Sequence, residues 1–313
     1  MTVFDFKKGL LKLGEGVWAY IQPDGSWGLN NAGLVTDKGA SLLVDTLYDL
    51  DLTREMLAAM KEKTGVSSFD RLVNTHDNGD HWFGNTAADA SEVIASKACA
   101  EAMAAFPPTV MAEIMKGAPK MGDMGEFFLQ CFGRYRYEKI EAALPTRTFE
   151  GSLNLGVGDL SVDLIEVGPC HTRGDVIVHI PERRIVFAAD ILFVGGHQIM
   201  WAGPVANYTR AIDTILSFEP EYIVPGHGPV TDAAGAEAVR TYWQYYEAEA
   251  RKRYDAGMPA FEAARDIPAG LYADYGDPER IVLNVNVLYK EFAGDPEPVN
   301  PVEQFAAMAR WHA

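Results

Sequence analysis

The sequence predicts a mixed α/β protein in which strands and helices pack in layers. Short apolar strands alternate with segments of helical period over residues 16–230, an order typical of this fold class. Polar side chains directly follow several of these strands, and the pattern becomes helical after residue 232. We therefore expect an α/β domain over 1–232 with a helical insertion at about 100–145, and a helical C-terminal extension over 233–313 packed on it.

Composition and charge narrow the class of partner. The chain has 313 residues, 48% apolar and 23% charged, as expected of a globular protein with a buried core. A net charge of −17 disfavours nucleic acid, whose phosphates need a basic surface. No apolar run is as long as a membrane span, and residues 1–16 lack the continuous apolar core of a signal peptide. These features predict a small-molecule partner, no nucleic acid, no membrane, and a cytoplasmic location.

The first part of the chain alternates strands with one long helix. Apolar runs separated by Asp-Gly and Lys-Gly turns predict a β meander over 16–46. Leucine and methionine at helical spacing predict a helix over 50–63. Further strands are expected at 69–74 and 92–96 because both segments are short, apolar and bounded by polar residues.

Residues 107–145 form an apolar insertion that proline and glycine break into short segments. Five of the 11 methionines lie between Met103 and Met124. Flexible, polarizable methionine suits an adaptable apolar binding surface, and on that interpretation the insertion covers a pocket. The alternative is an architectural insertion whose methionines fill gaps in a core. The candidate substrate-binding residues of the insertion are Met111, Met115, Phe127 and Phe128.

The second part of the chain returns to strands and then becomes helical. Strands are expected at 149–156, 159–167, 175–181 and 183–190, followed by a helix at 207–218 and a strand that leads to residue 227. In the extension, one apolar helix face consists of Val239, Tyr242, Trp243 and Tyr246. Asp277 and Pro278 predict the start of another helix, with Asp as cap and Pro at the first position.

One loop concentrates the polar side chains that can bind a metal. The stretch LVNTHDNGDHWFGN presents His76, Asn78, Asp80 and His81 directly after an apolar strand. Imidazole and carboxylate are ligands of divalent transition metals, and spacings this short let one turn bring several to one point. Three further candidates each follow an apolar strand: His171, Asp190 and His227.

The order and contexts of these segments resemble the metallo-β-lactamase superfamily, whose signature is His-x-His-x-Asp-His, then a distant His, an Asp and a His. The resemblance covers roughly residues 15–230, and Asn78 stands where the family has its second His. It implies an αβ/βα sandwich, with Asp45 as a structural aspartate. It also implies two metal positions bridged by Asp190, one at His76 and His171 and the other at Asp80, His81 and His227.

The resemblance implies zinc as the cofactor, as one or two ions, with iron or manganese as alternatives. Asn78 is a neutral and weaker ligand than imidazole, so several outcomes stay open. Two ions could bind with unequal affinity, one ion could occupy only the second position, or a harder metal could replace zinc. An inactive descendant of the family is the fourth outcome.

Four other side chains are weighed for roles near the metal. Asp80 could orient or deprotonate a water, or protonate a leaving group. His197, in the glycine-rich loop after Asp190, is a candidate acid, and the alternative is an exposed loop histidine. Trp82 and Trp201 are candidate walls of a substrate pocket. The two remaining histidines, His179 and His312, are expected to be structural and solvated, respectively.

The resemblance implies a metal-dependent hydrolase that uses a metal-bound hydroxide on an ester, lactone or thioester. The methionine-rich insertion and the absence of a basic pocket signature predict that this substrate is largely apolar. One alternative is a metal-dependent cyclase or lyase acting on a polyketide-like or aromatic substrate. The other is a ligand-binding protein on a degenerate hydrolase fold. The helical extension is a candidate surface for a homo-oligomer.

Overall fold

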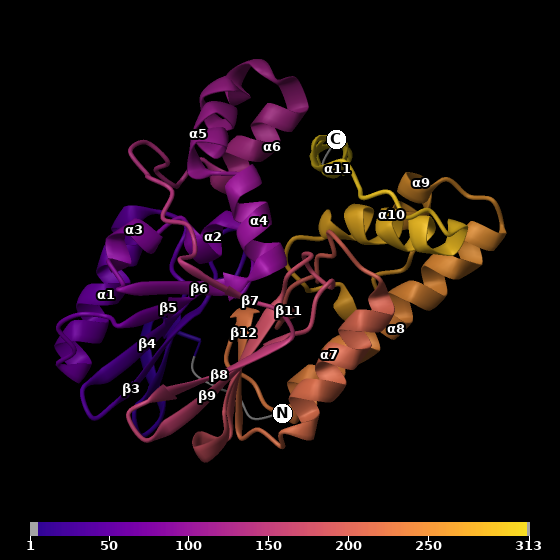
Figure 1. Ribbon diagram of the computed structural model, residues 1–313. Coiled ribbons are helices and arrows are strands. Elements are labelled where there is room, and N and C mark those ends of the chain that lie inside the picture. Colours follow the sequence, from indigo (N-terminus) through magenta and orange to yellow (C-terminus); the bar gives the residue numbers. More distant parts are fainter. Residues whose placement is uncertain (1–5, 312–313) are drawn as a thin grey trace.

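The computed structural model describes residues 6–311 and shows the αβ/βα sandwich that the resemblance implies (Figure 1). Two sheets pack face to face, and helices cover their outer faces. Buried apolar side chains meet between the sheets, such as Val35 and Leu42 from the first and Val162 and Phe187 from the second. Burial of these side chains is the main favourable contribution to folding.

The first sheet begins as the predicted meander and becomes parallel towards the site. Within the described residues its strands follow chain order: β1 (Gly9–Gly14), β2 (Val17–Ile21), β3 (Ala32–Asp37), β4 (Ala40–Val44), β5 (Arg71–Val73), β6 (Glu92–Ser96) and β7 (Arg147–Phe149). β4, β5, β6 and β7 pair in parallel. The loop after β5 therefore leaves at the carboxyl edge of the sheet, where α/β proteins place their ligands.

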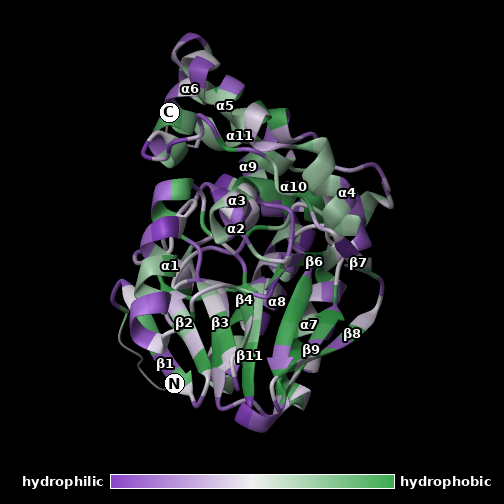
Figure 2. Cartoon of the chain, turned by 60° about the vertical axis from the view of Figure 1, so that its left-hand side comes forward, coloured by the Kyte–Doolittle hydropathy of each residue, from purple (hydrophilic) through white to green (hydrophobic). Residues whose placement is uncertain are grey.

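The second sheet is mostly antiparallel. Its spatial order is β12 (Tyr222–His227), β11 (Ile185–Phe193), β10 (Val176–Ile180), β9 (Leu160–Glu166) and β8 (Ser152–Val157), with a short 3-10 turn η2 (Pro181–Arg183). β11 and β12 are the parallel pair, so Asp190 and His227 approach the same edge. β11 is largely hydrophobic (Figure 2), because it is buried along its whole length, whereas β9 alternates buried and half-buried residues.

Helices cap the outer faces of both sheets. α1 (Leu50–Thr64) packs Met56 and Met60 against the first sheet, begins at an Asp49 side chain that accepts from the Leu52 N–H, and ends at Gly65 in the left-handed region. The short helices α2 (Gly79–Trp82) and α3 (Asn85–Ala88) follow the metal loop. α7 (Val205–Ser217) and α8 (Ala233–Asp255) cover the second sheet (Figure 1).

The insertion rises above the first sheet as a group of short helices (Figure 1). It consists of α4 (Lys97–Ala105), α5 (Pro108–Gly117), the turn η1 (Ala118–Lys120) and α6 (Gly122–Phe132). Proline and glycine divide these helices as the sequence predicts. The chain then returns to β7 without regular structure over 133–146.

The C-terminal extension is helical, as predicted. It consists of α8, then α9 (Ala260–Asp266), the turn η3 (Gly270–Tyr272), α10 (Arg280–Ala293) and α11 (Pro301–Ala309). α11 lies beside α6 of the insertion, so the two helical additions meet (Figure 2). The proposed domain boundaries and the homo-oligomer stay predictions.

Three local predictions need correction. α10 begins at Arg280, because Asp277 has a φ of 58° and forms an ion pair with Arg280 in place of a cap. Asp190 does not end its strand, since β11 continues to Phe193. β1 was not expected, because its Lys and Gly residues weaken the strand pattern.

Two other sequence expectations can be placed on the structure. His179 lies in β10 with its ring stacked on Phe218 at 4.0 Å, which is a structural role. His312 lies outside the described residues. Among residues 6–311, no helix is both long and apolar enough to cross a membrane.

Candidate metal centre

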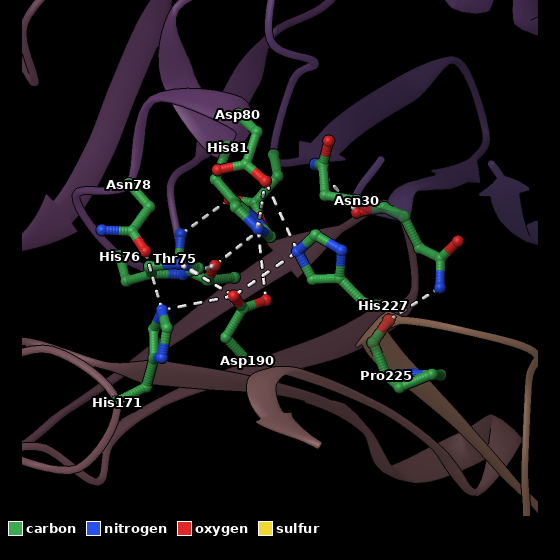
Figure 3. A network of polar contacts seen from close by, with 12 residues as sticks. Asn30, Thr75, His76, Asn78, Asp80, His81, His171, Asp190, Pro225 and His227 are labelled. Carbon is green, nitrogen blue, oxygen red and sulfur yellow. Dashed lines mark hydrogen bonds and ion pairs between the residues drawn. The ribbon is translucent and has the colours of Figure 1, made fainter. Parts of the chain in front are cut away.

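The predicted metal ligands converge on one point between the two sheets (Figure 3). They come from the loop after β5, helix α2, the loop between β9 and β10, β11, and the end of β12. Six of them are buried and form two groups whose ligand atoms lie within 4.8 Å of one another: His76, His171 and Asp190, and Asp80, His81 and His227. This is the grouping that the resemblance implies.

Asp190 lies between the two groups. Its Oδ1 is 3.2 Å from His81 Nε2, and its Oδ2 is 3.2 Å from His171 Nε2. The same Oδ2 is 3.5 Å from His227 Nε2 and 3.6 Å from His76 Nε2. The carboxylate therefore has one oxygen available for each metal position.

Glycine lets the two strands approach closely enough for this geometry. A Cβ at Gly226 would lie 1.8 Å from Asp190 Oδ1, so no other residue fits before His227 without displacing the carboxylate. The Pro-Gly-His sequence at the end of β12 is thus a consequence of how near the two ligand strands lie.

The donor set fits a divalent cation. His76 Nε2, His81 Nε2 and Asp190 Oδ1 are buried and have no hydrogen-bond partner among the residues that the structure describes. A buried polar atom without a partner costs about 1–3 kcal/mol. A transition metal bound to imidazole nitrogen and carboxylate oxygen would satisfy these atoms together.

Asp45 orients the ring of His81. It is 2% exposed, and its Oδ2 lies 2.8 Å from His81 Nδ1. Its Oδ1 and Oδ2 also accept hydrogen bonds of 2.7 Å from the Thr75 N–H and hydroxyl. A carboxylate can only accept, so Nδ1 of His81 carries the proton and Nε2 presents its lone pair to the centre.

Backbone carbonyls orient two further imidazoles in the same way. His171 Nδ1 donates to the carbonyl of Ile199 at 2.7 Å, and His227 Nδ1 donates to that of Gly25 at 3.1 Å. Both Nε2 atoms are left as ligands. Burial lowers the pKa of His171 to about 3, so its ring is neutral and able to bind a metal.

Asn78 lies at the first metal position. Its Oδ1 is 2.8 Å from His171 Nε2. Because Nδ1 of His171 donates to a carbonyl, Nε2 carries a lone pair that faces the amide oxygen. Two acceptors at this distance repel each other unless a cation contacts both, or unless the amide is turned so that its NH₂ faces the ring.

The carboxylates give the centre an excess of negative charge that calls for a cation. Burial opposes charge on His81, but Asp190, Asp45 and Asp80 outweigh it and raise the pKa of the ring well above its usual value. Burial likewise opposes charge on Asp190, and the surrounding histidines, His227 first, lower its pKa well below the usual range. Protons and a metal therefore compete for the same atoms, so metal binding should release protons.

A largely apolar cavity of about 1030 Å³ opens over the centre. Asp80, His171, Asp190 and His227 contribute to its lining. Aromatic, methionine and aliphatic side chains of the insertion and of the C-terminal helices form a large part of the remaining lining. The helical additions thus build the walls of a pocket whose base is the metal centre.

The structure divides the candidate pocket residues into two sets. Met111, Phe128 and Trp201 line the cavity, whereas Met115, Phe127 and Trp82 do not. Trp82 is fully buried, and its indole N–H donates to the Asp77 carbonyl at 3.0 Å. Its role there is to hold the metal loop.

His197 occupies neither of its expected positions. It is 1% exposed, so the surface interpretation is wrong. Its Nδ1 lies 3.1 Å from the Tyr242 hydroxyl, its carbonyl accepts from Arg280, and it is absent from the cavity lining. Burial lowers its pKa to about 4. This environment supports a packing role for a neutral ring.

A stack of rings joins the centre to α10. The ring of Phe193 lies parallel to the His227 imidazole, with centroids 4.7 Å apart. The guanidinium of Arg280 lies 4.9 Å from the Phe193 centroid and 4.6 Å from that of Trp27. Arg280 is held by Asp277 Oδ2 at 2.9 Å and is almost completely buried.

Several cavity residues escaped the sequence analysis. Trp27, Arg280 and Phe305 all line the cavity, yet they come from a loop near the N-terminus and from two helices of the extension. None stands in a motif. The available signal was the aromatic character of Trp27 in an otherwise polar segment. Phe305 gave no such signal, because alanine and methionine follow it in its helix.

Comparison with known proteins identifies related sequences. The family model of the metallo-beta-lactamase superfamily matches residues 25–227. The 2,4-dinitroanisole O-demethylase subunit alpha of Nocardioides sp. (strain JS1661) is 24% identical over 195 residues, which are 59% of this chain and 48% of that protein. Acyl-coenzyme A thioesterase MBLAC2 of Bos taurus and of Homo sapiens is 24% identical over 100 residues, or 30% of this chain and 35% of each relative. The matches thus span at most about half the length of these relatives.

Solved structures share the fold. The sec-alkylsulfatase Pisa1 from Pseudomonas sp. superposes with a TM-score of 0.69 at 13% identity, covering 95% of this chain and 53% of that one. A metallo-beta-lactamase from Pontibacter korlensis has a TM-score of 0.55 at 18% identity, covering 76% of this chain and 99% of that one. At these identities the likeness is one of fold.

Proposed function

The chain belongs to the metallo-beta-lactamase superfamily, and from that membership we propose that it is a metal-dependent hydrolase of a largely apolar ester, lactone or thioester. The observation that carries the proposal is the position of the centre. Four histidines and two aspartates converge at the base of a mostly apolar cavity of about 1030 Å³. Apolar pockets with a few convergent polar groups are typical of small-molecule sites.

The residues present fit one or two divalent ions, with zinc as the first candidate and iron or manganese as alternatives. His76, His171 and Asp190 would hold one ion, and Asp80, His81 and His227 the other. When bound, the metal supplies a Lewis acid and lowers the pKa of water towards neutrality.

Asp80 is the side chain best placed for proton transfer. It lines the cavity, and its Oδ2 is 3.4 Å from His227 Nε2. Burial opposes its charge, but His81 and His227 outweigh this effect and lower the pKa of the carboxyl. Asp80 is therefore ionised at neutral pH and accepts a proton first, which it then returns to the leaving group.

The apolar walls keep bulk water from the reacting bond and orient the substrate by its apolar part. One relative is an acyl-coenzyme A thioesterase, which supports a thioester among the three candidate bonds. The Nocardioides relative is named as an O-demethylase, so a substrate with an aromatic body is also consistent with the aromatic walls.

Metal removal tests the proposal. The protein is stripped with a chelator, reloaded separately with zinc, iron or manganese, and assayed with matched esters, thioesters and lactones. We expect turnover of at least one class, lost on stripping and restored by one metal. A reloaded protein that binds metal and turns over none of the three classes would refute it. A protein that never binds metal would favour the ligand-binding alternative.

A further inference from the structure

We propose that the apolar part of the substrate lies between α6 of the insertion and α11 of the C-terminal extension, and that Phe305 of α11 limits its length. The inference rests on the proposed hydrolase and names its substrate class: esters or thioesters that carry a long apolar chain. Phe305 would then be a specificity-determining residue supplied by the extension.

Phe305 occupies the place where three separate segments meet at the cavity. It is half-buried and lines the cavity. Its ring centroid lies 4.7 Å from that of Phe128 on α6, 5.5 Å from Trp201 after β11, and 5.9 Å from Trp27 near the N-terminus. An aromatic side chain with neighbours on several sides has a fixed position, as a residue that measures length must have.

A continuous set of contacts leads from the metal centre to Phe305. The backbone N–H of Trp201 donates to the backbone carbonyl of the metal ligand His171 at 2.9 Å, and the Trp201 ring contacts Phe305. Both rings line the same cavity. A substrate whose reacting bond lies at the metals therefore has an apolar path past Trp201, with Phe305 at its far side.

The remaining walls fit a flexible chain. The insertion contributes Met111, Met121 and Met124 together with Phe128, and methionine adapts to ligands of varied shape. Of the charged lining residues, Asp295 and Glu297 are exposed, Lys290 and Glu291 are half-buried, and Arg280 is buried in an ion pair with Asp277. The cavity volume, about 1030 Å³, lies at the upper end for small-molecule sites, which are about 300–1,000 Å³.

A chain-length series tests the proposal. Metal-loaded protein is assayed with straight-chain nitrophenyl esters and the matching thioesters, from acetyl to palmitoyl. Each methylene buried against the walls should raise kcat/KM up to about fourfold until the chain reaches Phe305, after which the profile levels off. Phe305→Ala should move this point to longer chains, and Phe305→Trp should move it to shorter ones.

Phe292→Ala is the matched control. Phe292 lies on the neighbouring helix α10, is half-buried, and packs with its centroid 3.6 Å from the Arg251 guanidinium, yet it does not line the cavity. Its loss should leave the chain-length profile unchanged. If Phe305→Ala fails to fold, as judged by circular dichroism, Phe305→Leu gives the same test with a smaller change in volume.

A binding assay separates failure of this inference from failure of the proposed function. A neutral naphthylamine dye bound to metal-free protein is displaced by alkanols of increasing length. Two results together would support the proposed position of the apolar chain and refute the hydrolase. Alkanol affinity would rise with chain length, with a limit that shifts in the Phe305 variants, and no ester would be turned over. Turnover whose chain-length profile is flat, or is the same in the wild type and both Phe305 variants, would overturn the inference and leave the hydrolase standing.

Discussion

Replacing Asp45 by Asn should weaken metal binding by reversing the tautomer of His81. The backbone N–H of Thr75 must keep an acceptor, so the amide oxygen takes the place of Oδ1. The new NH₂ then occupies the Oδ2 position, 2.8 Å from His81 Nδ1. Nδ1 must accept this hydrogen bond, which moves the ring proton to Nε2, the atom that faces Asp190.

The size of the effect follows from the role of such partners. Loss of a side chain that orients a metal ligand costs about 10–100-fold in affinity, or about 1.4–2.8 kcal/mol at 1.4 kcal/mol per tenfold change. The loss should fall on the position that contains His81. The Thr75 hydroxyl also donates to Asp45 Oδ2 at 2.7 Å and would lose that acceptor. Because this hydroxyl lies 3.0 Å from His76 Nδ1, we expect a smaller, indirect loss at the first position.

Calorimetric titration of metal-stripped protein with zinc measures both affinities, and nitrogen NMR of the imidazoles reports the tautomer. Asp70→Asn is the control, because Asp70 also accepts a backbone N–H, that of Ser41 at 2.8 Å, away from the centre. Unchanged affinity at the His81 position, with its Nε2 still free of a proton, would refute the reasoning.

The remaining predictions concern the ligands and one buried acid. Asn78→Ala should lower metal affinity at the first position if the amide oxygen is a ligand. A rise in affinity would mean that the amide NH₂ blocks that position. Metal titration with anomalous diffraction measures whether affinity there falls or rises. Asp190→Ala and His81→Ala should each abolish turnover and leave the circular dichroism spectrum unchanged, since the core between the sheets does not depend on them; retained turnover would contradict their assigned roles. Burial, helped by Glu247, raises the pKa of Glu291 from 4.5 to about 7, so folding favours the protonated carboxyl. The contribution of Glu291 to the free energy of unfolding should therefore fall as pH rises from about 4.5 through 7. Chemical denaturation across this range should show less pH dependence in Glu291→Gln, and equal slopes in both proteins would disprove the assignment.

The metal ligands could be predicted because each stands in a short motif in or near the carboxyl half of a strand. The resemblance to the family then implied the grouping of His76 with His171 and of Asp80 with His81 and His227, and the structure has the same grouping. The resemblance also implied a structural role for Asp45, which directly follows β4.

The pocket could be predicted only in part, because its walls are assembled from distant segments. A methionine-rich insertion indicated an apolar surface, and Met111 and Phe128 do line the cavity. Which side of each short helix faces inwards depends on α11, about 180 residues further along the chain, and no local period encodes that contact. His197 was misjudged for the same reason: a glycine-rich loop suggests exposure, but Tyr242 and Arg280 of the extension bury it.

The stack of His227, Phe193 and Arg280 connects α10 to the metal centre, whereas α11 contributes no residue to this stack. α10 cannot separate from the core without withdrawing a guanidinium from between two rings, one of which lies flat on a metal ligand. α11 follows α10 through the exposed segment 294–300 and meets the cavity through the ring of Phe305. Opening the cavity at α11 therefore leaves the ligand geometry intact, whereas opening it at α10 does not. Under the proposed function, α11 would therefore serve the exchange of substrate and α10 the retention of metal.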